Sequence, residues 1–373
     1  RPYDDRTSFC GWLRRFLPAV DPTRNWEVIN AGGISYASYR AARLMEELAD
    51  YEPDLFIVYS GHNEFLESRT YNKLLKVPKF LRSLAVVASR TRLYSLLSDL
   101  INKGDAVLPT EVTALLDHSV GPDDYHRDDE KRDAILNDYK TSLFHMTNIS
   151  ERAKAKLIFV TPASNIGDFS PFKSEPSYNL SPLEISQVET FKNALTTALN
   201  ESDYLRAETI AKEALAIDDR DPELLYLHAQ ALRALERIDE ARSAFIQSRD
   251  EDVCPLRALT PVRKIVTEVA QTKNTGFVDF VQIVNEKSPN RIPGSELFLD
   301  HVHPTIDGNQ LLALAIVQEM LQEEMLSQSA TWNEDIIAEI SGELKNSLDQ
   351  KTHAMALRNL SKVLMWGGKN DEA

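Results

Sequence analysis

The segment "DLFIVYSGHNEFLE", residues 54–67, is the strongest indication of fold class in this chain. Its first part, "DLFIVY", is a continuous apolar run, which is typical of a parallel strand covered on both faces. Gly61, His62, Asn63 and Glu64 follow that run in consecutive positions. Ligands of open parallel sheets bind beyond the carboxyl ends of the strands. The segment therefore predicts a strand followed either by a catalytic loop or by an ordinary polar turn.

The residues before this segment predict the rest of a βαβ unit. Apolar residues at helical spacing predict a helix over residues 7–19, with Thr7 or Ser8 as its N-cap. "WEVINAGG", residues 26–33, indicates a short buried strand, and residues 38–51 an amphipathic helix. Strand, helix and strand in this order favour a parallel sheet with a right-handed connection.

The later residues predict more elements of the same kind. We expect a helical insertion at about 66–140, whose last part, "VGPDDYHRDDEKRD", is acidic and loop-like. The segments "KLIFVTPASN" and "GFVDF" predict two more strands of the sheet. Helices predicted over 139–155 and 309–325 would pack on its faces.

An internal recurrence interrupts this pattern. Ala207 and Ala214 recur 34 positions later as Ala241 and Ser248. Small residues at that period resemble the tetratricopeptide repeat. The tail from residue 353 resembles the first helix of another such unit, with Ser361 at a small-residue position. An ordinary helical hairpin is the alternative for both segments.

These patterns predict a domain organisation. Residues 1–184 and 256–328 would form the two parts of one α/β domain, and residues 185–255 an inserted tetratricopeptide-like unit. Residues 329–373 would be C-terminal helices.

The overall charge narrows the choice of partners. The formal net charge is −15, with no Lys/Arg-rich block, which disfavours non-specific binding of nucleic acid or anionic lipid. A small-molecule substrate or a protein partner fits better. Cys10 and Cys254 have no metal-ligand or redox spacing, and we expect no cofactor. The sequence begins without Met, so we expect a fragment, with an export signal or membrane anchor upstream and a bacterial cell envelope location.

Asp300 and His303, in "LFLDHVHPTIDGNQ", are the candidate catalytic pair. A carboxylate three residues before a histidine can accept the Nδ1 proton and leave Nε2 as a general base. A second copy of this spacing, Asp123 to His126, has no preceding strand and is typical of a solvated loop. Asn63 could donate its carboxamide N–H to an oxyanion, or it could belong to a simple turn with Gly61.

Together these residues resemble the SGNH, or GDSL-type, hydrolase family of esterases and acyl-group hydrolases. Its third motif, Gly-x-Asn, matches Gly61-His62-Asn63, and its fourth, Asp-x-x-His, matches Asp300 to His303. The oxyanion glycine of its second motif falls on Ser35, or on Gly33 if the alignment slips by two positions. The resemblance covers residues 7–180 and 255–325. It implies a flavodoxin-like three-layer α/β/α sandwich with a parallel sheet and an oxyanion hole formed by Ser35, Gly61 and Asn63.

The first motif of that family, which carries the nucleophilic serine, is absent from this chain. We expect the serine upstream of Arg1, and little or no hydrolase activity in the chain as given. The complete protein would then be a serine ester hydrolase or acyl transferase. Two alternatives remain: a protein-binding repeat scaffold with a degenerate hydrolase domain, and a metal-dependent phosphoesterase using "GHNE" with His301 and His303.

Overall fold

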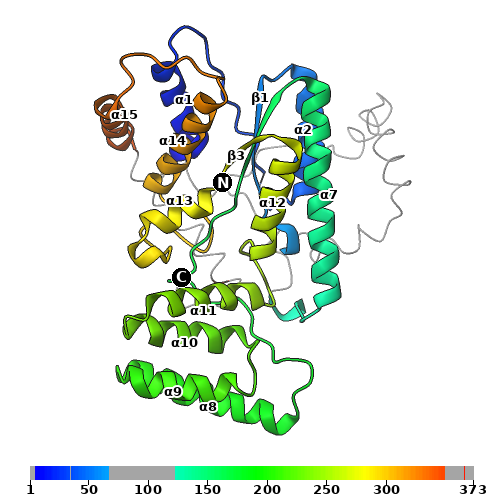
Figure 1. Ribbon diagram of the computed structural model, residues 1–373, viewed down its shortest axis with the longest axis vertical. Coiled ribbons are helices and arrows are strands. Elements are labelled where there is room, and N and C mark those ends of the chain that lie inside the picture. Colours follow the sequence, from blue (N-terminus) through cyan, green and yellow to red (C-terminus); the bar gives the residue numbers. More distant parts are fainter. Residues whose placement is uncertain (1–4, 34, 67–121, 349–364, 366–373) are drawn as a thin grey trace, which may run out of the picture.

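The part of the chain that the structure describes has a mixed α/β fold that is mainly helical, with one small parallel sheet. The computed structural model describes residues 5–33, 35–66 and 122–348 together with Met365 (Figure 1). Most of the expected insertion at 66–140 and the repeat-like tail lie outside these described residues.

The sheet of the described residues has the order β1-β2-β3. β1 (Leu55–Tyr59) pairs in parallel with β2 (Lys156–Val160), and β2 pairs in parallel with β3 (Gly276–Val278). These are three of the four expected strands, and their parallel pairing is confirmed.

Helices cover both faces of the sheet, and alternate residues of β2 show which helices lie on each side (Figure 1). Ile158 and Val160 belong to a core with α1 (Phe9–Val20), α13 (Phe280–Lys287) and α14 (Ile306–Gln322). Leu157 and Phe159 pack in the opposite core. That core contains residues of α2 (Ser38–Leu48), α7 (Asp129–Ala153) and α12 (Thr260–Lys273). Burial from both sides explains why the strand "LIFV" is apolar without alternation.

The first helix begins directly after one of its two predicted N-cap residues. The Ser8 side chain accepts a hydrogen bond from the backbone N–H of Gly11, so Ser8 rather than Thr7 is the N-cap of α1. The N–H of Phe9 donates to Asn309 Oδ1 at 3.0 Å, which joins the start of α1 to α14. The helices expected over 7–19, 38–51 and 309–325 are confirmed as α1, α2 and α14.

Two expectations about local structure are wrong. Residues 26–33 form no strand. The Val28 carbonyl accepts from Arg14 Nε, and Asn30 Oδ1 accepts from the N–H of Gly32, so this backbone is bonded outside a sheet. Part of the acidic segment expected as a loop is helical instead, because α7 begins at Asp129.

Four helices form a separate layer at one end of the molecule (Figure 1): α8 (Pro182–Asn200), α9 (Tyr204–Leu215), α10 (Pro222–Ala234) and α11 (Ile238–Glu251). Each packs against the next in sequence. The recurring residues Ala207, Ala214, Ala241 and Ser248 are all buried. Small buried side chains let neighbouring helices approach closely. In the structure the four stacked helices span residues 182–251, where the sequence predicts a repeat-like unit over 185–255.

The remaining elements are short or terminal. α15 (Glu334–Asn346) packs against α1. Single 3₁₀ turns occur at Asp5–Thr7, Ala49–Tyr51, Pro122–Asp124 and Pro289–Arg291. Of the helices in the described part of the chain, none has the length and apolar character needed to cross a bilayer.

Candidate active site

The second residue of the loop after β1 is a glycine that no other residue could replace without strain. Gly61 has φ +138°, a conformation that L side chains rarely adopt. A Cβ at this position would lie 2.8 Å from Val262 Cγ1 and 2.9 Å from Pro162 Cγ. The Tyr139 hydroxyl donates to the Ser60 carbonyl at 3.1 Å and holds the chain just before it. The backbone of the loop is thus fixed by its neighbours on α7 and α12.

Glu64 anchors the other end of this loop. Its carboxylate accepts the backbone N–H of Ser38 at 2.9 Å and the Ser38 hydroxyl at 2.8 Å. Ser38 is the first residue of α2, whose N-cap, Ala37, makes no side-chain cap bond. A buried carboxylate at a helix N-terminus compensates unpaired N–H groups and the positive end of the helix dipole. Glu64 therefore has a structural role in fixing the loop to α2.

The structure brings the candidate oxyanion residues onto neighbouring segments. Asn63 Nδ2 donates to the Tyr36 carbonyl at 3.3 Å, so the Asn63 side chain lies against the residue that follows Ser35. Ser35 has φ 57°, the left-handed conformation, and therefore turns the chain sharply at this point. Gly61, Asn63 and the segment containing Ser35 thus lie around one corner between β1 and α2.

Asp300 and His303 form a close pair on the loop before α14. His303 Nδ1 lies 2.5 Å from Asp300 Oδ2, and Asp300 Oδ1 accepts the backbone N–H groups of Val302 and His303 at 2.7 and 2.6 Å. Asp300 is buried, whereas the His303 side chain is 36% exposed. The carboxylate therefore faces the interior and the imidazole reaches the surface.

The charge state of Asp300 determines which ring nitrogen carries the proton. Burial alone would raise its pKa, but the charges of His303 and His301 and the hydrogen bonds from His303 outweigh burial and lower the pKa well below its usual value. An ionised carboxylate only accepts hydrogen bonds, so Nδ1 of His303 must carry the proton. In the neutral form of the ring, Nε2 is then the nitrogen that can accept a proton.

Two further histidines surround this pair. His301 is buried against Phe169 and Phe172, with ring centroids 5.3 and 5.0 Å away, and its Nδ1 lies 3.7 Å from Asp300 Oδ1. His62 Nδ1 accepts the N–H of Ala258 at 3.1 Å. Because this nitrogen accepts, the proton of the neutral His62 ring is on Nε2.

Burial keeps His62 neutral. Burial is the largest cause, and the charges of His301 and His303 act in the same direction; together they lower the pKa of His62 to about 3 and disfavour the imidazolium. Its Nε2 is a buried atom without a hydrogen-bond partner among the described residues. A buried N–H donor without a partner is costly and calls for an explanation, which a functional site can supply. From the sequence, His62 has a role only in the metal-dependent alternative.

A buried arginine positions the loop that packs on His301. Arg257 Nη1 donates to the carbonyls of Asn165 and Phe169 at 3.0 and 2.8 Å, and the N–H of Asn165 donates to the His301 carbonyl at 3.0 Å. Asp252, 3.7 Å from Arg257, accepts backbone N–H groups from the same loop. Sequence reasoning missed Arg257 because its partners lie about 90 positions away.

The second Asp-x-x-His copy differs from the first in its surroundings. The His126 side chain is 74% exposed, and its Nδ1 lies 2.8 Å from Glu175 Oε1. Asp123 and His126 are exposed, as expected of a solvated segment, but Pro122–Asp124 form a 3₁₀ turn and Tyr125 is buried. In the described part of the chain, no three or more His, Cys, Asp or Glu side chains are grouped so as to hold a metal ion.

Comparison of the chain with protein-family models, with curated proteins and with solved structures gives no match.

Proposed function

We propose that this chain carries the acid–base and oxyanion parts of a serine ester hydrolase or acyl transferase of the SGNH type. The observation that carries the proposal is the buried Asp300 carboxylate, which holds Nδ1 of His303 while the ring reaches the surface. A general base for a hydroxyl nucleophile requires this orientation and tautomer.

The proposed reaction has two proton transfers through His303. A serine hydroxyl attacks the acyl carbonyl of an ester, and Nε2 of His303 takes the serine proton. Asn63 and backbone N–H groups near Ser35 and Gly61 donate to the oxyanion of the tetrahedral intermediate. The intermediate collapses to an acyl-serine, and His303 returns the proton to the departing alcohol. Water, or a second alcohol in a transfer reaction, then releases the acyl group by the reverse sequence.

The placement of α1 supports a nucleophile that precedes this helix. Asn309 accepts from the N–H of Phe9, and its own Nδ2 donates to the Pro304 carbonyl at 2.9 Å. The start of α1 is therefore one side chain away from the loop that carries His303. A serine on a strand leading into this region, encoded upstream of Arg1, would be near Nε2. The helices on both faces of the parallel sheet agree with the proposed three-layer sandwich, of which this strand would be a further member.

The test is ester hydrolysis by the protein expressed with its upstream coding sequence. We expect that sequence to encode an apolar strand ending in Gly-Asp-Ser or Gly-x-Ser, and the longer protein to hydrolyse p-nitrophenyl acetate or butyrate. His303→Ala should lower kcat by about 10³-fold or more, because the general base is lost. Asn63→Ala should lower it by roughly 10²–10³-fold through loss of one oxyanion donor.

The second Asp-x-x-His copy supplies a matched control. His126→Ala removes an exposed histidine of the same spacing and should leave hydrolysis unchanged. Equal losses in His126→Ala and His303→Ala would overturn the assignment of His303. An upstream sequence without a serine on a strand would overturn the mechanism as a whole.

A protein-binding scaffold is the second candidate, favoured by the stacking of α8–α11 around small buried residues. Stacked helix pairs form surfaces that hold peptides or protein segments. Binding of a partner at these helices would be unaffected by His303→Ala, which distinguishes it from substrate binding at the proposed active site.

A further inference from the structure

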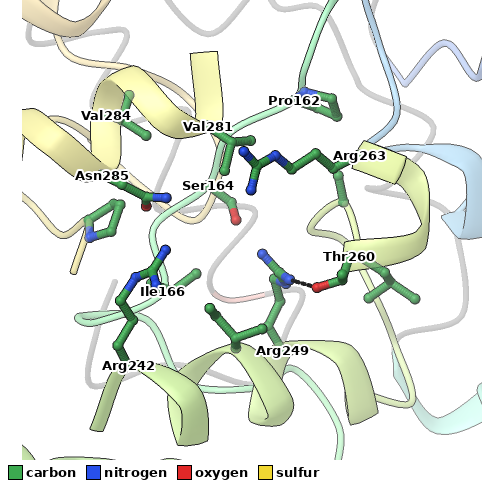
Figure 2. A pocket seen from close by; sticks show the side chains of 14 residues that line it. Pro162, Ser164, Ile166, Arg242, Arg249, Thr260, Arg263, Val281, Val284 and Asn285 are labelled. Atoms are coloured by element: carbon green, nitrogen blue, oxygen red, sulfur yellow. Dashed lines mark hydrogen bonds between the residues drawn. The ribbon is translucent and has the colours of Figure 1, made fainter. Parts of the chain in front are cut away.

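A second site lies between the helical stack and the α/β part of the molecule. It is a cavity of about 60 Å³ below the end of β2, bounded by α11 on one side and by α12 and α13 on the other (Figure 2). Its lining includes Ser164, Arg242, Arg249, Thr260, Arg263 and Asn285. The backbone of residues 162–166 separates it from the His301 loop, which Asn165 contacts from the other side.

The cavity has an unusual charge for this protein. Among the described residues, three arginines line it and no Asp or Glu does, although the whole chain has a net charge of −15. In Figure 2 the guanidinium groups of Arg242, Arg249 and Arg263 point toward the same space. Like charges that share a small cavity repel one another, so this arrangement favours a bound anion.

The arginines differ in how far their charge is already compensated. Arg249 donates to Asp250 Oδ1 at 2.8 Å and to Thr260 Oγ1 at 2.7 Å, and Arg263 donates to Asp279 Oδ2 at 2.6 Å. Neither aspartate lines the cavity. Arg242 donates from Nε to the Arg291 carbonyl at 3.2 Å and pairs with no carboxylate among the described residues. Arg242 therefore contributes a positive charge to the cavity, and its remaining N–H groups can donate to a ligand.

Neutral donors complete the lining. Ser164 is buried, and its side chain lines the cavity. The Asn285 side chain lies on the opposite wall, on α13 (Figure 2). The first turn of α12, at Thr260, adds the positive end of a helix dipole. Hydroxyl, amide and guanidinium groups around one space form a set of donors suited to the oxygens of an anion.

We propose that this cavity binds the oxyanion group of a small ligand, a phosphate or a carboxylate. Its volume is about twice the share of one water molecule in the liquid, so it admits one such group and leaves the rest of a larger ligand outside. Guanidinium groups match the geometry of both oxyanions. The bound group would contact both α11 of the helical stack and α12 of the α/β part. It would therefore link these two parts of the molecule. This inference does not depend on the hydrolase proposal.

The test measures binding of inorganic phosphate and of acetate to the intact protein by calorimetry and by thermal unfolding, with ionic strength held constant by sodium chloride. We expect saturable binding of at least one of them, with a rise in Tm, since a ligand that binds only the folded state stabilises it. Arg242→Gln should raise the Kd by about tenfold or more, because a charge-assisted hydrogen bond is lost.

Arg206→Gln is the matched control, because Arg206 lies on α9, is 55% exposed and is absent from the lining of the cavity. It changes the net charge equally and should leave the Kd unchanged. Ser164→Ala supplies an independent lining variant and should also weaken binding. Binding of phosphate alone assigns the site to a phosphate group, and binding of acetate alone to a carboxylate. No saturable binding of either, or equal weakening by Arg242→Gln and Arg206→Gln, would overturn the proposal.

Discussion

At the scale of single residues, Gly61 combines a backbone conformation that L side chains rarely adopt with close neighbours on two sides. Its φ is +138°, and two carbon atoms would lie within 3 Å of any Cβ placed there, so a side chain has no strain-free position. We expect Gly61→Ala to lower the free energy of unfolding by about 1–3 kcal/mol through backbone strain and overpacking. Urea or thermal unfolding followed by circular dichroism measures this loss.

Gly342, inside α15, is the matched control, since a Cβ there would meet no atom within 4 Å. Gly342→Ala should raise stability by about 0.5–1 kcal/mol, because alanine is the better helix former. Equal effects of the two substitutions would show that the loop at Gly61 is less constrained than the contacts imply.

His62 makes stability depend on pH. Burial depresses its pKa in the folded protein to about 3, whereas the unfolded value is 6.5. Between these values the unfolded chain binds a proton that the folded protein excludes, so the free energy of unfolding falls as pH is lowered from about 6.5 toward 3. His62→Asn removes the titrating ring and keeps an acceptor for the N–H of Ala258.

The free energy of unfolding of the variant should therefore fall less steeply as the pH is lowered, by up to about 1.4 kcal/mol per pH unit. Urea unfolding at pH 7, 6, 5 and 4.5 measures the slope. His228, whose pKa burial also lowers, titrates in both proteins, so the comparison isolates His62. Equal slopes for the two proteins would mean that His62 takes up its proton in the folded protein as readily as in the unfolded chain.

What sequence reasoning finds at this scale depends on the range of each interaction. The pairing of Asp300 with His303 follows from a spacing of three residues and could be predicted. The roles of His62 and Arg257 could not be predicted, because each bonds to a residue far away in the sequence. His62 bonds to Ala258, which follows the helical stack, and Arg257 bonds to Asn165. The cavity arginines come from two helices, and no local pattern relates Arg242 to Arg263.

At the scale of elements, the segment at 26–33 shows why a strand pattern can fail. Its burial alternates with period two over residues 26–31, as in an extended chain, and Ile29 is 64% exposed. A strand also needs a neighbour to accept its backbone hydrogen bonds, and no described strand pairs with these residues. Side-chain patterns predict an extended conformation, whereas pairing depends on residues elsewhere in the chain.

The start of α7 shows the opposite error. Asp128 caps this helix by accepting the N–H of Lys131 at 2.9 Å, and Asp129 and Glu130 lie in its first turn. Acidic residues are favoured there because they meet unpaired N–H groups and the positive end of the helix dipole. The acidic run that suggested a loop was in part a helix N-terminus, and the apolar spacing of Ile135, Leu136 and Tyr139 continued it.

At the scale of the whole molecule, a cluster of ionic bonds joins the helical stack to the α/β part. Arg220, in the α9–α10 connection, donates to both oxygens of Asp129 at 2.9 and 3.0 Å and to Glu251 at 2.9 Å. Arg127 also donates to Glu251, at 2.7 Å, and its side chain is only 5% exposed. The hydrogen bonds from Arg220 lower the pKa of Asp129, which keeps this carboxylate ionised beside its paired cation.

Arg220→Met should therefore loosen the attachment of the stack, because it leaves the partly buried Asp129 and Glu251 with fewer donors. We expect a loss of about 1–3 kcal/mol and faster amide hydrogen exchange in α8–α11 than in β2. Arg206→Met breaks an exposed pair with Glu201 at 3.4 Å and should cost at most about 0.5 kcal/mol. Exchange that accelerates equally in β2 and in α8–α11 would show that the stack and the sheet unfold as one cooperative unit, and that these bonds stabilise the molecule without defining a boundary within it.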